Sequence, residues 1–368
     1  MWNRPSVCLA LSLYFSIPAS LFGASCFAPP IEIGTEVRGA GIVVGDLNND
    51  GLPDFIVSDC GTGSAGTVYL GKGDGTFRHS GMKTFSRCAS SLALADFNHD
   101  GNLDLAAAQG SAAGVLLGNG DGTFQAEKHY PSGDVAYSVA AGDFNNDGNP
   151  DMLVDDHFLG THYYFAGNGD GTFQAGKRIP KTSGNSSSQW STAADFNADG
   201  NLDFVFLGTS LVLSLGNGDG TFGKHCSYPG GFFTMGDLNL DQIPDIVVVS
   251  AEGNDSQLTV LLGNGDGSMT ALAPISTPNQ IYPAIGDLNQ DGIPDVVLGN
   301  LHFPDVSVMY GNGDGTFQNR LLVNTKVSEQ VKLADFNQDG FVDILTWTGG
   351  YARDGVNIML STGQCQGF

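Results

Sequence analysis

Residues 95–105 read ADFNHDGNLDL, which places three aspartates, two asparagines and a glycine within nine residues. These carboxylates repel one another and lie between two apolar runs. The same phrase, D-x-N-x-D-[G/Q]-x-x-D, occurs seven times and begins at Asp46, Asp96, Asp143, Asp195, Asp237, Asp287 and Asp335. The intervals between successive starts are 42 to 52 residues. The sequence is therefore an array of seven repeats.

A second phrase comes after the first at a steady offset in six of the repeats. It reads LGKGDGTF at 70–77, LGNGDGTF at 117–124 and 215–222, AGNGDGTF at 166–173, LGNGDGSM at 262–269 and YGNGDGTF at 310–317. Asp-Gly between two apolar runs favours a hairpin, because both residues tolerate positive φ. The segments between the phrases, such as DFIVS and PDIVVVS, are short and β-branched or apolar, which is typical of strands. No stretch shows a capped helical period.

Each repeat therefore predicts four strands, one on either side of the acidic phrase and one on either side of the Asp-Gly turn. This pattern is typical of a propeller blade, so we predict an all-β, seven-bladed β-propeller of antiparallel strands that forms one domain over 26–368. The seventh repeat ends before a fourth strand. The segment 25–37 resembles the sequence after each Asp-Gly turn, with Phe27 in the place of Phe124 or Phe173. We expect it to supply the missing outer strand and to close the ring.

The first 25 residues have the features of a secretory signal peptide. Arg4 precedes an apolar stretch from Val7 to Ile17, and GAS at 23–25 is a small-residue cleavage site. Cleavage of the bacterial lipoprotein type before Cys26 is the alternative. The apolar run is too short to span a membrane. We expect a secreted protein without a transmembrane segment, which in a bacterium would be periplasmic or at the cell surface.

Export would place the cysteines in an oxidising compartment, where disulfides form. Ring closure would bring Cys26 beside Cys365, and Cys60 and Cys88 fall in loops of neighbouring blades. These are the two candidate disulfides, and Cys226 is left without a predicted partner. The alternative is that all of them are buried free thiols.

Oxygen ligands dominate each acidic phrase. Side chains at the first, third and fifth positions converge, the sixth-position glycine permits a sharp turn, and the seventh carbonyl and ninth carboxylate complete an all-oxygen cage. Such a cage suits Ca²⁺, so we expect up to seven structural calcium ions. An EF-hand is excluded because no Glu stands at the twelfth position. The alternative is that these clusters only form turns. The predicted ligands are Asp46, Asn48, Asp50, Asp54, Asp96, Asn98, Asp100, Asp104, Asp143, Asn145, Asp147, Asp151, Asp195, Asn197, Asp199, Asp203, Asp237, Asn239, Asp241, Asp245, Asp287, Asn289, Asp291, Asp295, Asp335, Asn337, Asp339 and Asp343.

The copy at 237–245 differs from the others. Gln242 replaces the glycine there, so a residue with a side chain must adopt a strained turn, and we predict the weakest calcium site in this loop. The charge balance supports the metal interpretation. The chain has 39 Asp+Glu against 15 Lys+Arg and a net charge of −24, and 27 of the acids lie in the acidic phrases and Asp-Gly turns. Nucleic acid is excluded as a partner, because it requires clusters of Lys and Arg.

In these two phrases the chain resembles the FG-GAP/VCBS repeat family, the integrin-α-type β-propellers with calcium loops on one face. The resemblance covers 27–362 and implies seven blades, each with Ca²⁺ between its first and second strands. The last blade departs from the pattern, since STGQCQGF replaces its Asp-Gly turn. Members of the family include adhesion ectodomains, lectins and propeller domains of polysaccharide-active enzymes. The fold alone therefore does not settle the function.

The rim opposite the acidic loops carries the variable segments, where we expect a binding surface. Five residues before each acidic phrase stand Gly41, Ser91, Ser138, Trp190, Phe232, Tyr282 and Gln330. Trp190, Phe232 and Tyr282 are aromatic in three consecutive repeats, which favours binding of a sugar or a peptide. The loops after the second strands add His157, Phe158, His302, Phe303, Trp347 and Tyr351. The alternative is that these rings fill the central channel or gaps between blades.

Catalytic residues are not predicted. No G-x-S-x-G motif is present, and most carboxylates belong to the acidic phrases and the Asp-Gly turns. His157 and His162, five residues apart, are the only histidines near metal-ligand spacing. We expect a secreted binding or adhesion module whose partner is an extracellular glycan or protein. The alternatives are a lectin-like glycan binder that uses the variable rim, and a polysaccharide lyase or hydrolase.

Overall fold

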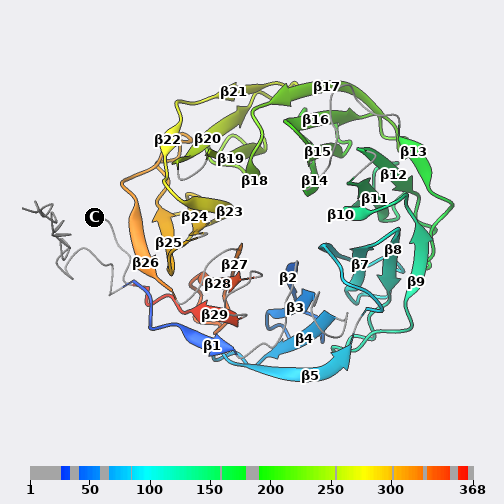
Figure 1. Ribbon diagram of the computed structural model, residues 1–368, viewed down its shortest axis with the longest axis horizontal. Helices are drawn as coiled ribbons and strands as arrows, with labels where there is room; N and C mark the ends of the chain where they lie inside the picture. Colours follow the sequence, from blue (N-terminus) through cyan, green and yellow to red (C-terminus); the bar gives the residue numbers. More distant parts are fainter. Residues whose placement is uncertain are drawn as a thin grey trace, which may run out of the picture.

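The computed structural model describes residues 26–33, 41–58, 66–83, 85–157, 160–179, 190–252, 255–300, 302–325, 330–348 and 355–363. Seven antiparallel sheets stand in a ring around a central opening, as Figure 1 shows. Every regular element of these residues is a strand. The prediction of an all-β, seven-bladed propeller is confirmed.

Six sheets follow one order along the chain, from an inner strand at the central opening to an outer strand at the rim (Figure 1). Blade 1 contains β2 (Ile42–Gly45), β3 (Asp54–Ser58), β4 (Gly66–Gly71) and β5 (Phe77–Lys83). Blade 2 contains β6 (Ser91–Ala95), β7 (Asp104–Gln109), β8 (Ala112–Leu116) and β9 (Lys128–Pro131). Blade 3 contains β10 (Ala136–Gly142), β11 (Asp151–Asp156), β12 (Thr161–Phe165) and β13 (Lys177–Ile179). Blade 4 contains β14 (Trp190–Ala194), β15 (Asp203–Leu207), β16 (Leu211–Gly216) and β17 (Phe222–Tyr228).

Blade 5 has a divided outer edge. It contains β18 (Phe232–Gly236), β19 (Asp245–Glu252) and β20 (Asp255–Gly263), and both β21 (Met269–Ala271) and β22 (Ile275–Ser276) pair with β20. Blade 6 contains β23 (Gln280–Gly286), β24 (Asp295–Asn300), β25 (Asp305–Met309) and β26 (Leu321–Asn324). Blade 7 contains β27 (Gln330–Ala334), β28 (Asp343–Thr348), β29 (Gly355–Met359) and β1 (Ile31–Ile33).

The N-terminal strand supplies the outer strand of the last blade. β1 pairs with β29 in antiparallel register, with Ile31 opposite Ile358. A bridge joins Phe27 to Ser361, as bridges join Phe124 to Gly118 and Phe173 to Gly167 in blades 2 and 3. The prediction that 25–37 completes blade 7, with Phe27 in the place of these phenylalanines, is confirmed for the described residues.

The core is divided among the seven junctions between blades. Second strands such as β3 and β7 are buried along their whole length, because a sheet covers each of their faces, and this explains their nearly continuous apolar sequences. One hydrophobic cluster lies at each junction. The cluster that joins blades 7 and 1 contains Phe55, Phe336 and Trp347. Blades 7 and 1, which lie far apart in the sequence, thus bury their facing sheets against each other as consecutive blades do.

The cysteines correct one prediction. Cys26 is a buried free thiol that packs in the cluster between blades 6 and 7 with Val297 and Ile344. The predicted bond from Cys26 to Cys365 is therefore absent, and Cys365 itself lies outside the described residues. Cys88 is disulfide-bonded, and Cys60, its predicted partner, lies outside the described residues, so that pairing stays a prediction. Cys226 is free.

The predicted signal peptide, residues 1–25, lies outside the described part of the chain. Among the residues that are described, none forms a helix of the length and apolar character needed to cross a membrane.

Candidate functional site

The seven acidic loops join the first and second strands of the blades and share one hydrogen-bond pattern. In blade 1, Asp50 N and Gly51 N donate to the two carboxylate oxygens of Asp46, at 3.2 and 2.8 Å. Asn48 Nδ2 donates to Asp50 Oδ2 at 2.8 Å. The bond from the sixth residue to the first aspartate, and the bond from the asparagine to the fifth aspartate, recur in all seven loops. The loops are thus held by their own backbone amides.

The ninth aspartate ties each acidic loop to the second phrase. Asp54 is buried and accepts hydrogen bonds from Leu47 N at 2.9 Å and from Gly71 N at 2.7 Å. Gly71 is the second residue of the second phrase, and a Cβ at this position would lie 2.6 Å from the Pro53 carbonyl oxygen. All seven ninth aspartates make this pair of bonds, and Ser361 takes the place of the glycine in blade 7. This link explains why the two phrases recur together.

Burial raises the pKa of these ninth aspartates. Asp54 reaches a pKa of about 6 and Asp343 a pKa of about 7. Hydrogen bonds from backbone amides lower the pKa and offset part of this effect, whereas the charges of the fifth and first aspartates raise it further. The charges of the first and fifth aspartates therefore disfavour ionisation of the ninth.

Side chains at the fourth position of the acidic loops connect neighbouring blades. Asn146 Nδ2 donates to Asn201 Oδ1 in the next loop at 2.6 Å, and comparable contacts join five of the seven junctions. The fourth position is Ala198 in blade 4 and Leu240 in blade 5, and neither side chain can form such a bond. The loop of blade 5 is therefore without these polar contacts on both sides, and Leu240 is 50% exposed.

Gln242 adopts the expected strained turn. Its φ is 70°, and its N–H donates to Asp237 Oδ2 at 2.8 Å, as the glycine N–H does in the other loops. The hydrogen-bond pattern of this loop is thus preserved at the cost of backbone strain. That this loop is the weakest calcium site stays a prediction.

The ligand chemistry of the acidic loops fits a hard cation. Each loop brings three carboxylates, an amide oxygen and a backbone carbonyl to one short turn, and oxygen ligands of this kind suit Ca²⁺. The carboxylates of one loop repel one another, and a bound dication would offset this repulsion. Within the described residues, however, no three Asp, Glu, His or Cys side chains are grouped as metal ligands. The carboxylates are bonded to loop amides instead.

An aromatic pocket lies toward the ends of the inner strands that are opposite the acidic loops. Trp190 begins β14, Phe232 begins β18 and Tyr282 belongs to β23. Their ring centroids are 6.3 Å apart for Trp190 and Phe232, 5.8 Å for Trp190 and Tyr282, and 4.2 Å for Phe232 and Tyr282. The rings of three consecutive blades therefore meet, and we call this site the channel pocket. Its nine lining residues are Trp190, Phe232, Phe233, Thr234, Tyr282, Pro283, Gln330, Val331 and Lys332.

A β-bulge positions the Tyr282 ring. The pairing of β23 with β24 passes from Ile281 to Pro283 and leaves Tyr282 out of register, and Tyr282 has a φ of 48°. Bulges redirect side chains, and such a backbone is costly for a residue with a side chain. Pro283 is tolerated here because β23 is an edge strand that faces the central opening. Tyr282 thus reaches the channel pocket through a strained backbone.

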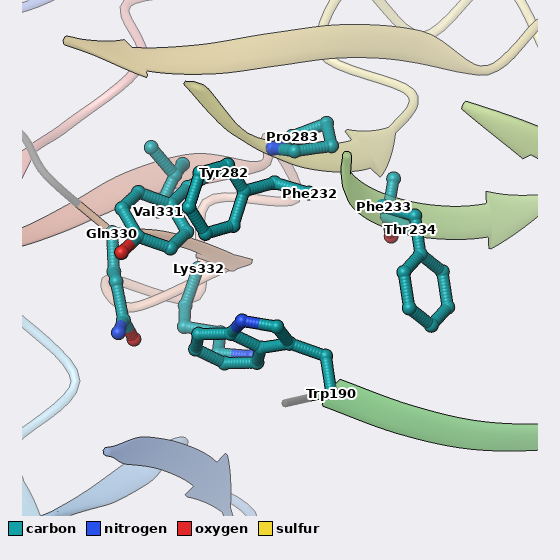
Figure 2. A pocket seen from close by; sticks show the side chains of 9 residues that line it. All are labelled: Trp190, Phe232, Phe233, Thr234, Tyr282, Pro283, Gln330, Val331 and Lys332. Atoms are coloured by element: carbon teal, nitrogen blue, oxygen red, sulfur yellow. The ribbon is translucent and has the colours of Figure 1, made fainter. Parts of the chain in front are cut away.

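The channel pocket is small and combines flat rings with two polar side chains. Its volume is about 130 Å³, whereas pockets for drug-sized ligands measure roughly 300–1,000 Å³. Figure 2 shows Trp190, Tyr282, Gln330 and Lys332 around one space. Gln330 was expected on this rim from its sequence position, but Lys332 was missed. The available signal was its spacing, since residues two apart on a strand share one face.

The other variable-rim residues do not join this pocket. His157 stacks on Tyr137, with ring centroids 4.7 Å apart. Phe303 is 55% exposed on the loop between β24 and β25. Trp347, expected in a surface loop, lies in β28 and is 1% exposed, because β28 extends into the core between blades 7 and 1. His302 lies on the same loop as Phe303, and Phe158 and Tyr351 lie outside the described residues.

Two of the described histidines lie beside acidic residues. His162 is buried, and its Nδ1 lies 2.5 Å from Asp155 Oδ1, whereas His157 is half-buried and stacks on Tyr137. Near blade 2, Ser86 Oγ and Glu127 Oε2 both approach Nε2 of His129, at 3.4 and 3.5 Å. A nucleophilic triad needs the two partners on different ring nitrogens. This cluster is therefore not a triad.

Several solved structures share this fold. The lectin BP39L from Burkholderia pseudomallei has a TM-score of 0.68 at 12% identity, and the match covers 89% of this chain and 97% of that chain. A lectin from Agrocybe aegerita, solved to explain recognition of non-reducing terminal N-acetylglucosamine, has a TM-score of 0.59 at 19% identity over 92% of this chain and 87% of that one. BBS1N, solved with ARL6DN, has a TM-score of 0.61 at 11% identity over 91% and 97%. These likenesses concern the fold.

No curated protein sequence matches the chain. The model of the FG-GAP-like repeat matches residues 46–107, 96–154, 237–298 and 287–346. Each of these matches spans two successive acidic loops, and together they cover more than half of the chain. The protein therefore belongs to the FG-GAP-like repeat family.

Proposed function

We propose that this protein is a secreted, calcium-stabilised binding module whose ligand is a glycan held in the channel pocket. The observation that carries the proposal is the meeting of Trp190, Phe232 and Tyr282, from three consecutive blades, around one cavity. Flat aromatic faces beside an amide and an amine suit a sugar ring, which has apolar faces and polar edges. A volume of about 130 Å³ suits one sugar unit better than a whole oligosaccharide. Two propellers of similar fold are lectins by name, which is compatible with this role.

The strained backbone of Tyr282 supports the same site. A φ of 48° at a bulge persists only where the surrounding structure requires it, and such residues cluster at ligand sites. The proposal assigns no catalytic step to the channel pocket. None of its nine lining residues is Asp, Glu or His, whereas glycoside hydrolysis generally uses a pair of carboxylates.

The proposal is tested by a glycan array with wild-type protein, Trp190→Ala and Phe303→Ala. Trp190→Ala should weaken glycan binding at least tenfold, a loss of about 1.4 kcal/mol, because the largest ring of the pocket is gone. Phe303→Ala removes an exposed ring outside the pocket and should bind like the wild type. Equal binding by Trp190→Ala, or no binding of any glycan by the wild type, would contradict the proposal. Cleavage of an arrayed polysaccharide would favour an enzyme instead.

Calcium is the second part of the proposal. The acidic loops would hold Ca²⁺ through their first, third, fifth and ninth side chains and the seventh carbonyl. The bound ion would neutralise carboxylates that otherwise repel one another in a chain of net charge −24. Its role would be structural, because the loops already link neighbouring blades.

Secretion is the third part. An Arg4 start, an apolar core and a small-residue site at 23–25 are the support for a signal peptide. Mass spectrometry of the protein exported by its own host should find a mature chain that begins at Cys26. An intact chain that begins at Met1 would count against export by this route.

A further inference from the structure

Lys332 is the cation of the channel pocket. It lies two residues after Gln330 on β27, so both side chains project from the same face of the strand. Figure 2 shows both beside the aromatic rings. The lining of the pocket contains no acidic residue, and Lys332 forms no ion pair within the part of the chain that the structure describes. A lysine without a carboxylate partner is unusual in a chain with 39 acids and 15 bases.

The Lys332 side chain is exposed to solvent on the inner strand β27. The protein around it desolvates the ammonium group and lowers its pKa. The acidic loops lie at the opposite ends of the inner strands, so their carboxylates do not pair with this amine. An anion that enters the pocket would meet a cation that has no competing partner among the described residues.

We infer that the channel pocket selects a sugar unit that carries a carboxylate, such as a uronic acid, with Lys332 as the anion-binding residue. This inference rests on the proposed glycan-binding function and adds the chemical class of the ligand. The Trp190 and Tyr282 rings would pack on the faces of the sugar, and the Gln330 amide would donate to a ring hydroxyl or to the carboxylate. A neutral sugar would make the same ring contacts but would leave Lys332 unpaired. The preference for the acid is therefore set by one residue.

The test compares matched sugars by isothermal titration calorimetry at low ionic strength. The methyl glycosides of glucuronate and glucose form one pair, and those of galacturonate and galactose form another, because each pair differs only at C6. Wild-type protein should bind the acid of at least one pair tenfold or more tightly than the neutral sugar. Added salt should weaken binding of the acid, since screening reduces the attraction between exposed charges.

Variants of Lys332 test whether this residue causes the preference for the acidic sugar. Lys332→Gln should bind the acidic and the neutral sugar about equally, because the charge that favours the acid is gone. Lys332→Arg keeps the charge and should keep the preference for the acid. Lys332 has solvent access, so both variants should fold, which a thermal melt monitored by circular dichroism checks.

The outcomes separate this inference from the proposed function. Equal binding of both members of every pair by the wild type, or an acid preference that survives in Lys332→Gln, overturns the inference and leaves glycan binding intact. If the wild type binds none of these sugars and no glycan on the array, both the inference and the proposed function are overturned.

Discussion

The ninth aspartate of each acidic loop has two opposing roles. Its carboxylate accepts two backbone hydrogen bonds that join the acidic loop to the third strand, and these bonds favour the charged form. Burial and the two neighbouring carboxylates favour the neutral form, and they prevail, so that the pKa of Asp343 rises to about 7 from an ordinary value of 3.8. In the absence of a cation, ionisation of this carboxylate is therefore less favourable in the folded chain than in the unfolded chain.

This balance predicts how the stability of the calcium-free protein depends on pH. Between pH 4 and about 7 the folded chain binds more protons than the unfolded chain, so the free energy of unfolding falls as pH rises through this window. In excess chelator, the melting temperature should be several degrees higher at pH 5 than at pH 7.5, as measured by calorimetry. Saturating calcium should remove this difference at pH 7.5, because the ion replaces the protons.

Two substitutions test whether the ninth aspartates cause this dependence of stability on pH. Asp343→Asn should lower stability, since an amide offers one acceptor to two N–H donors, but it should also reduce the pH dependence. Asp314→Asn is the matched control, because a hydrogen bond from Thr316 lowers the pKa of that exposed turn aspartate. This variant should still lose stability as the pH rises above 5. Identical melting temperatures at pH 5 and pH 7.5 in chelator would contradict this explanation of the ninth aspartates.

At the scale of the element, the acidic loop of blade 5 departs most from its siblings. Both positions of positive φ hold residues with side chains, Leu240 at 62° and Gln242 at 70°. The other loops have glycine at the sixth position, and five of the seven loops reach the next loop through a polar side chain at the fourth. The loop of blade 5 is thus strained and less connected at the same time.

Gln242→Gly should stabilise the protein by about 1 kcal/mol, because glycine adopts positive φ without steric cost. The control is the reverse change at the same position of blade 6, Gly292→Gln. Gly292 has a φ of 81° and open space where a Cβ would lie, so this substitution changes backbone strain without a clash and should destabilise by a similar amount. Chemical denaturation measures both. A Gln242→Gly protein no more stable than the wild type would show that the strain is relieved by other contacts.

Local sequence was sufficient to predict the strands and the acidic loops. The turn residues and the apolar runs are both encoded within each repeat, so every blade could be assigned from its own residues. The register of Phe27 against Ser361 was predictable because the N-terminal segment repeats the sequence after each Asp-Gly turn. Trp347 was assigned to a loop by mistake, because the length of β28 depends on its packing between blades 7 and 1, which no single repeat reveals.

The channel pocket was only partly predictable. The aromatic positions five residues before the acidic loops identified Trp190, Phe232 and Tyr282. That their rings meet depends on the bulge at Tyr282, which neither the repeat length nor the composition indicates. Lys332 was missed because a single lysine on an inner strand has no sequence signature. The role that we propose for it depends on a pocket lining without carboxylates, which only the structure shows.

At the scale of the whole molecule, the ring is held by seven apolar junctions and by loops that carry most of the negative charge. The apolar junctions are distributed evenly, and the last of them packs blade 7 on blade 1 through residues such as Phe55 and Trp347. The acidic loops all connect first strands to second strands, so their charges gather on one face. We propose that a cation balances this charge, and Ca²⁺ is the ion that oxygen ligands of this kind suit.

The most direct test of this claim is the metal content of the folded protein. The protein is purified without chelator, passed through calcium-free buffer and analysed by inductively coupled plasma mass spectrometry, with folding confirmed by circular dichroism. We predict several calcium ions for each chain, up to one for each of the seven acidic loops. A fully folded chain that contains no calcium would contradict a structural role for the ion.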